Sequence, residues 1–164
     1  MKRYAILAVL LSAVVLMAVA CAGAPKFSDI QNKDWKLVEV WNKSTAHPED
    51  IHFERIKLTK EGFSEIFTLR FDSDIADGMA RINGVGAPNH FFAPYTLEDK
   101  QGISIKPIAQ TLMAPLHEPE KLKEHEYLMY LQNTTTWNIV KGNLVLHSQS
   151  ESGAEVIMTF VLAK

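Results

Sequence analysis

Short runs in which apolar and polar residues alternate constrain the fold of this chain more than any other feature of its sequence. In these runs every second side chain is apolar. Examples are Trp35 and Leu37, the alternate residues from Phe91 to Leu97, Ile103 and Ile105, and Leu144 and Leu146. Such alternation is typical of a β-strand with one buried face. Because turn-forming residues separate the runs at intervals of about 8–12 residues, the pattern predicts about eight short antiparallel strands in a closed or strongly curved sheet.

One segment has the period of a helix instead. Pro119 suits the first turn of a helix, Glu118 and Glu120 favour its positive end, and good helix formers continue to Gln132. The side chains expected to face the sheet are Leu122, Tyr127, Leu128 and Leu131. The predicted fold class is therefore α+β, a single compact domain in which a curved, barrel-like antiparallel sheet packs against one main α-helix.

The N-terminal residues have the layout of an export signal. Lys2 and Arg3 precede an uncharged run from Tyr4 to Cys21, and small residues follow. The run lies at the lower edge of the roughly 20 apolar residues that a membrane-spanning helix needs, so cleavage is the better interpretation. Residues 18–21 (AVAC) resemble a bacterial lipobox, although Ala18 stands where leucine is usual. They also suit ordinary signal peptidase, which would release a soluble protein.

Cys21 favours the lipoprotein interpretation because it is the only cysteine in the chain. An unpaired cysteine in an exported protein needs an explanation, and lipidation supplies one. We therefore expect residues 1–20 to be a signal peptide, 21–33 a lipid-anchored tether, and 34–164 the folded domain. The anchor predicts the bacterial cell envelope as the location and the membrane as a partner. Ala22 favours the outer membrane, with the domain in the periplasm or outside the cell.

Composition and motifs give no sign of catalysis or of a cofactor. The formal net charge is −2 and the basic residues form no cluster, which argues against a nucleic-acid partner. His117 and His125 are eight residues apart, too far for one metal ion on a helix face. The sequence has no G-x-S-x-G motif, and Gly84-x-Gly86 lacks the helix and third glycine of a phosphate loop. We therefore expect no metal, no cofactor and no enzymatic activity.

Several spaced motifs, taken in order, resemble the META (HslJ-like) domain family, from about Asp34 to the C-terminus. They are N-x-F-x-x-x-Y at Asn89, Phe91 and Tyr95, T-x-M at Thr111 and Met113, the helical pair Glu126-Tyr127, and G-N-x-L-x-L at Gly142 to Leu146, in the hairpin that begins at Trp137. Many members carry cysteines where this chain has Pro88 and Pro115. Because both cysteines are replaced, the resemblance makes a cysteine nucleophile improbable for the family. It implies the α+β fold predicted above and often an exported or membrane-anchored protein.

The resemblance implies no defined reaction. We therefore expect a non-enzymatic envelope lipoprotein that binds a partner protein or an apolar ligand, with a role in envelope stress or drug tolerance. The family-motif residues would be structural or would line a pocket, and the aromatic side chains are expected mainly in the core. Two alternatives stay open: a hydrolase-like enzyme with a dispersed site near Asn89, His90 and Tyr95, and a purely structural, stress-protective envelope protein.

Overall fold

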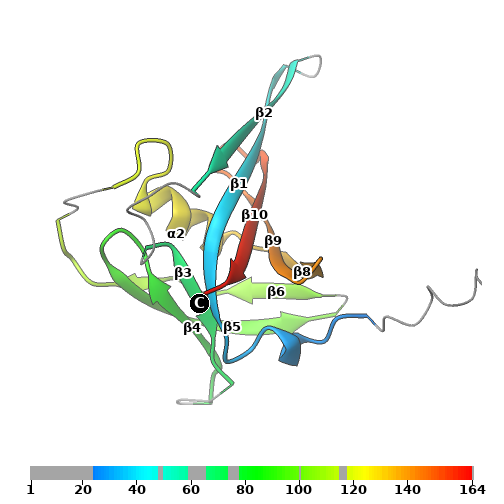
Figure 1. Ribbon diagram of the computed structural model, residues 1–164, viewed down its shortest axis with the longest axis vertical. Coiled ribbons are helices and arrows are strands. Elements are labelled where there is room, and N and C mark those ends of the chain that lie inside the picture. Colours follow the sequence, from blue (N-terminus) through cyan, green and yellow to red (C-terminus); the bar gives the residue numbers. More distant parts are fainter. Residues whose placement is uncertain are drawn as a thin grey trace, which may run out of the picture.

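The described part of the chain forms a β-barrel with one α-helix beside it and a hairpin that projects beyond it (Figure 1). The computed structural model describes residues 24–47, 50–58, 66–73, 78–99, 101–114 and 118–163. The described elements are the 3-10 helix η1 (Phe27–Asp29), the strands β1 (Asp34–His47), β2 (Asp50–Lys57), β3 (Thr68–Phe71), β4 (Arg81–Val85), β5 (His90–Glu98), β6 (Gly102–Ile105) and β7 (Ala109–Gln110), the helix α2 (Glu124–Gln132), and the strands β8 (Thr136–Val140), β9 (Asn143–Gln149) and β10 (Glu155–Leu162).

The sheet closes because β1 pairs with β3 along one edge and with β10 along the other. Around the ring the order is β1, β10, β9, β8, β6, β5, β4 and β3, and the pairings between these strands are antiparallel. The strands β2 and β7 lie outside the ring, paired with β1 and β5. The predicted fold class, a barrel-like antiparallel sheet with one helix in a single domain, is confirmed.

Core side chains fill the interior of the barrel. The aromatic residues expected in the core are all buried, each less than 5% exposed: Trp35, Phe91, Tyr95, Tyr127 and Trp137. Leucine, isoleucine, valine and methionine side chains pack around them. Burial of this apolar surface is the main favourable contribution to folding. The described side chains therefore form a packed core inside the barrel.

Two details of the predicted pattern differ from the structure. A β-bulge between Leu37 and Glu39 changes the parity of β1, so that Val40 follows Trp35 and Leu37 into the core. On β5 the alternation ends early, because Leu97 lies beyond the covered part of the strand and is 50% exposed.

The helix α2 is shorter than predicted and begins at Glu124 rather than near Pro119. The side chain of Glu126 accepts a hydrogen bond from the backbone N–H of Lys123, and that of Glu118 accepts one from the N–H of Glu124. These bonds satisfy N–H groups that the first turn of a helix leaves unpaired. Leu122 is buried as expected, but it lies in the turn that precedes the helix.

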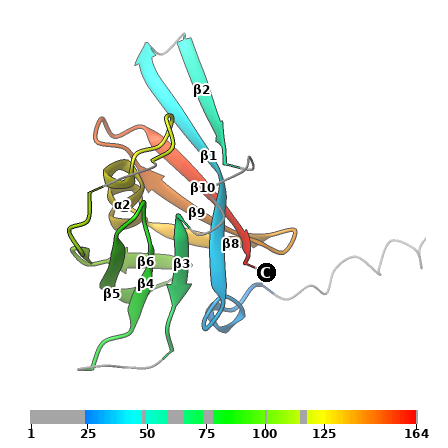
Figure 2. The ribbon, with the colours of Figure 1, turned by 60° about the vertical axis from the view of Figure 1, so that its left-hand side comes forward.

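Residues 27–33, predicted to belong to a tether, are part of the folded domain. The ring of Phe27 lies 5.2–5.5 Å from the rings of Phe71, Tyr95 and Trp137, measured between centroids, and Ile30 is fully buried. Figure 2 shows η1 below the start of β1, near the C-terminus. The folded domain therefore begins near Phe27 rather than at Asp34. The predicted signal peptide, Cys21 and Pro115 lie outside the described residues.

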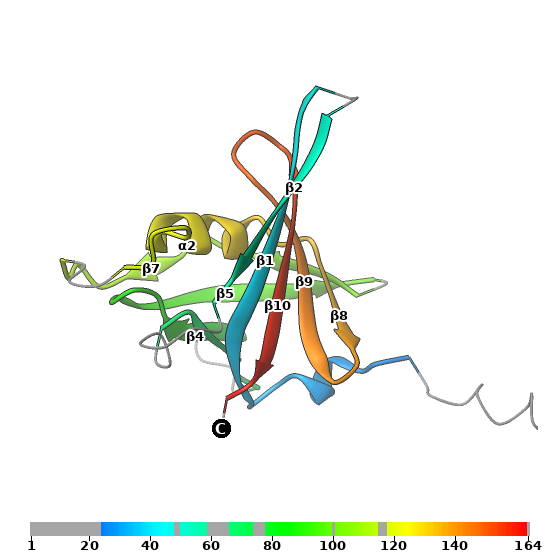
Figure 3. The ribbon, with the colours of Figure 1, turned by 45° about the horizontal axis from the view of Figure 1, so that its top comes forward.

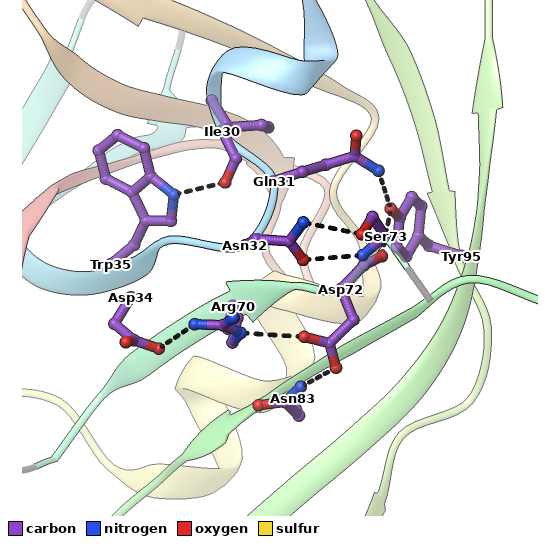
Figure 4. A network of polar contacts seen from close by, with 10 residues as sticks. All are labelled: Ile30, Gln31, Asn32, Asp34, Trp35, Arg70, Asp72, Ser73, Asn83 and Tyr95. Atoms are coloured by element: carbon purple, nitrogen blue, oxygen red, sulfur yellow. Dashed lines mark hydrogen bonds and ion pairs between the residues drawn. The ribbon is translucent and has the colours of Figure 1, made fainter. Parts of the chain in front are cut away.

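A polar network fixes this N-terminal segment to the barrel (Figure 4). The indole N–H of Trp35 donates to the carbonyl of Ile30 at 2.9 Å, and the carboxamide of Gln31 donates to the Tyr95 hydroxyl at 3.2 Å. Asn32 exchanges two hydrogen bonds with Ser73, at 2.7 and 3.0 Å. Together with the ring contacts of Phe27, these bonds hold η1 as a cap on one end of the barrel.

The β1–β2 hairpin projects from the opposite end (Figures 1 and 3). The pairing between β1 and β10 ends at Asn42 and Val156, and from Lys43 onward β1 pairs only with β2. The hairpin therefore extends beyond the ring of strands, away from η1. Among the described residues, no helix is long and apolar enough to cross a membrane.

Candidate functional site

The loop before β5 is joined to α2 by a buried carboxylate, that of Glu124. Its Oε1 accepts the backbone N–H groups of Ala87 and Asn89 at 2.5 and 2.8 Å, and its Oε2 accepts the Asn89 side-chain amide at 2.6 Å. The Ala87–Pro88 peptide bond is cis. Gly86 leaves room for the carboxylate, since a Cβ atom there would lie 2.3 Å from its Oε1. The sequence singled out Glu126 and missed Glu124.

Asn89 also holds the segment that follows β7. Its Oδ1 accepts the Thr111 hydroxyl at 2.9 Å and the Met113 backbone N–H at 2.7 Å, while its amide donates to the Met113 carbonyl at 3.3 Å. The structure thus brings together three family-motif residues that lie up to 24 positions apart. With its carboxamide fully engaged and only 4% exposed, Asn89 has a structural role.

The other family-motif residues are also structural. The Tyr127 ring packs against Phe67 and Phe91, with centroids 4.9 and 5.9 Å away, and its hydroxyl donates to the Thr68 carbonyl at 2.9 Å. As described above, Glu126 caps α2, while Tyr95 and Trp137 pack on η1 at the other end of the barrel.

The structure does not assemble the enzyme site considered near Asn89, His90 and Tyr95. Asn89 is buried, whereas His90 is exposed on the outer side of β5. Tyr95 lies six positions after Asn89, about 20 Å along an extended strand. Its hydroxyl is engaged by Gln31 and the carbonyl of Asp72. Within the described ranges, no three histidine, cysteine or acidic side chains gather as metal ligands would.

The burial of Tyr127 has a consequence for alkaline stability. Burial raises the pKa of its phenol well above the ordinary range. Above about pH 10, tyrosines of the unfolded chain ionise, while Tyr127 keeps its proton in the folded state. Unfolding then releases a proton, so the free energy of unfolding should fall by up to about 1.4 kcal/mol per pH unit for this group.

Tyr127→Phe is therefore expected to have opposite effects at two pH values. At neutral pH it should cost about 1 kcal/mol, because the hydrogen bond to the Thr68 carbonyl is lost. Above about pH 10 the free energy of unfolding of the variant should fall less steeply with pH, because one titrating group has been removed. Urea unfolding at a series of pH values checks both effects. An unchanged alkaline slope would contradict the assignment of the slope to Tyr127.

An open groove lies between α2, the β9–β10 turn and the place where the hairpin leaves the barrel. Its volume is about 500 Å³, within the range of known ligand sites. The residues that line it are Asn42, His125, Glu126, Met129, Tyr130, Ser150, Glu151, Ser152 and Ala154. The described lining residues include two glutamates and no lysine or arginine, and Met129 and Tyr130 provide apolar surface.

One of the residues that line the groove, Asn42, has a buried polar atom without a partner in the described part of the chain. Its side-chain oxygen is buried and has no hydrogen-bond partner among the described residues. Buried polar atoms are normally paired, so an unpaired acceptor in the lining of a groove is a notable exception. The sequence offered no signal for this site, because its walls come from β1, α2 and the β9–β10 turn, which are distant along the chain.

Comparison with known proteins identifies the domain and its fold. The META domain profile matches residues 28–160. The barrel is similar to the NMR structure of a protein from Burkholderia xenovorans, with a TM-score of 0.56 and 15% identity over 80% of this chain and 83% of that one. It also resembles the crystal structure of a DUF4847 family protein from Bacteroides vulgatus ATCC 8482, with a TM-score of 0.49 and 15% identity over 80% and 93% of the two chains. No curated protein matches the sequence.

Proposed function

The chain belongs to the META domain family, and we propose that it is a non-enzymatic lipoprotein of the bacterial cell envelope. Its META domain would bind a partner protein in the groove beside α2, in support of envelope stress resistance or drug tolerance. The observation that carries the proposal is the combination of a solid barrel interior with an open, acidic groove at the base of a projecting hairpin. A ligand of such a domain binds on its outside.

The anchor at Cys21 rests on the sequence alone and is tested separately. If Cys21 carries lipid, cells grown with labelled palmitate should incorporate the label into the protein, and the protein should be found in the membrane fraction. Cys21→Ala should abolish both the labelling and the membrane association. Equal membrane association of the two proteins, without palmitate in either, would show that the chain is not a lipoprotein.

The chemistry of the groove favours a polypeptide segment that carries basic and apolar side chains. Glu151 supplies negative charge at the rim, and Met129 and Tyr130 supply apolar surface. Charge complementarity of this kind contributes to specificity and to the rate of association.

In-cell cross-linking tests the groove as a binding site. A photoreactive amino acid placed at His125 or at Ser152, on opposite walls, is expected to trap the same protein from both positions. Glu151→Lys should reduce the yield at both. The matched control is the same amino acid at Lys141, an exposed residue in the β8–β9 turn at the other end of the barrel. If all three positions trap the same proteins in equal yield, or if neither groove position traps any, the proposal that a partner binds in the groove is refuted.

A further inference from the structure

Exposed apolar side chains surround the end of the barrel that η1 covers. Large hydrophobic residues that are about half exposed occur at four strand ends or turns there: Met79 (45%), Leu97 (50%), Val140 (45%) and Leu162 (50%). About half of each side chain is therefore open to solvent. Single exposed apolar residues are ordinary, but a group at one end of a molecule indicates a contact surface.

The pairing of the strands shows that these residues share one end. Leu162 pairs with Trp35, whose indole bonds the carbonyl of Ile30 just after η1. Val140 pairs with Asn143 in the adjacent β8–β9 turn. Figures 2 and 3 show this turn, η1 and the C-terminus at the end opposite the hairpin.

The other two residues, Leu97 and Met79, lie at the same end, as contacts of β5 and β3 show. Leu97 follows Tyr95, whose hydroxyl is bonded by Gln31 of the N-terminal segment. Met79 lies just before β4, where the carbonyl of Arg81 accepts the N–H of Asp72 at the end of β3. The four side chains therefore surround the cap formed by η1.

The chain leaves the domain at this same end, only a short distance after the proposed lipid anchor. Lys26 lies five residues after Cys21, and five residues span at most about 18 Å when fully extended. We infer that the η1 end of the barrel lies on the lipid bilayer and that its four apolar side chains contact the membrane interface. The inference rests on the proposed anchor at Cys21.

The charges at this end do not supply the contact. The described charged residues here include Lys26, Lys33 and Lys141, and also Asp29, Glu98 and Asp99. Because these described residues carry no excess of positive charge, they attract anionic lipids only weakly, and apolar insertion is expected to supply the contact. The orientation would point the hairpin and the acidic groove away from the membrane, where a partner protein could reach them.

Fluorescence quenching in vesicles tests this orientation with the full, lipidated protein. Because lipid occupies Cys21, a single introduced cysteine can be labelled with a thiol-reactive fluorophore. We would label Val140→Cys and Leu162→Cys at the η1 end, and Leu112→Cys as the control. Leu112 is 94% exposed in the segment after β7, away from η1. The proteins are reconstituted into phosphatidylcholine vesicles with and without an acyl-chain quencher.

The result expected is strong quenching at positions 140 and 162 and almost none at 112. Equal quenching at all three positions, or stronger quenching at 112, overturns the orientation while leaving the anchor intact. Vesicle flotation is measured in parallel with the Cys21→Ala protein as the reference. If the unmutated protein floats no better than that reference, the anchor itself is refuted, and the orientation with it.

Discussion

Replacing Glu124 by alanine is expected to lower the free energy of unfolding by about 4 kcal/mol, because three buried donors lose their acceptor at once. These are the backbone N–H groups of Ala87 and Asn89 and the side-chain amide of Asn89. The carboxylate is nine-tenths buried, so water cannot readily replace it. A loss of this size is a large part of the total stability of an ordinary domain.

Two control variants separate the hydrogen bonds from the general effect of removing a glutamate. Glu124→Gln keeps an acceptor for the two backbone N–H groups but places a donor opposite the Asn89 amide, so it should cost about 2 kcal/mol. Glu120→Gln, on an exposed residue before the helix, should have almost no effect. Urea unfolding followed by tryptophan fluorescence measures all three. A loss for Glu124→Ala no larger than that for Glu120→Gln would refute the structural role of the carboxylate.

The same carboxylate shows why the fold was more predictable than the site. Strand positions follow from a local alternation, and the β8–β9 turn from the Lys141-Gly142 pair, which has the positive φ angles that a two-residue hairpin needs. Such signals lie within a few residues of the structure they predict. Glu124, in contrast, is one of several glutamates near the start of a helix. Its partners lie 35 and 37 positions earlier, and only the closed barrel brings them together.

The predicted domain boundary failed for a related reason. Small residues and a proline after Cys21 resemble a flexible linker, and the alternation that marks the first strand begins only at Trp35. Phe27 and Ile30 are the two apolar residues that could have indicated that this segment packs on the domain, since the rest of it is expected in solvent. Their role is clear only when the barrel end that they cover has formed, since it is built from strands spread over the whole domain.

A protein that begins at Asp34, the boundary predicted from sequence, should be less stable than one that begins at Ala22 by about 5 kcal/mol. It would lose the buried side chain of Ile30 and most of the contact area of Phe27, each worth about 2 kcal/mol. The Trp35 indole would lose its acceptor, at a further cost of about 1 kcal/mol or more. Since small domains have only about 5–15 kcal/mol in total, the shorter protein is expected to be partly or wholly unfolded.

Circular dichroism and urea unfolding of the two proteins measure this difference, and Phe27→Ala in the longer protein provides an intermediate. That variant keeps the backbone and Ile30, so it should lose about 2 kcal/mol and remain folded. Lys26→Ala serves as the control, because its side chain is exposed and outside the packed cap. Equal stability of the proteins beginning at Ala22 and Asp34 would mean that residues 27–33 are a tether after all. The bilayer would then lie at a variable distance from the barrel, and the orientation inferred above would lose its short, fixed connection to Cys21.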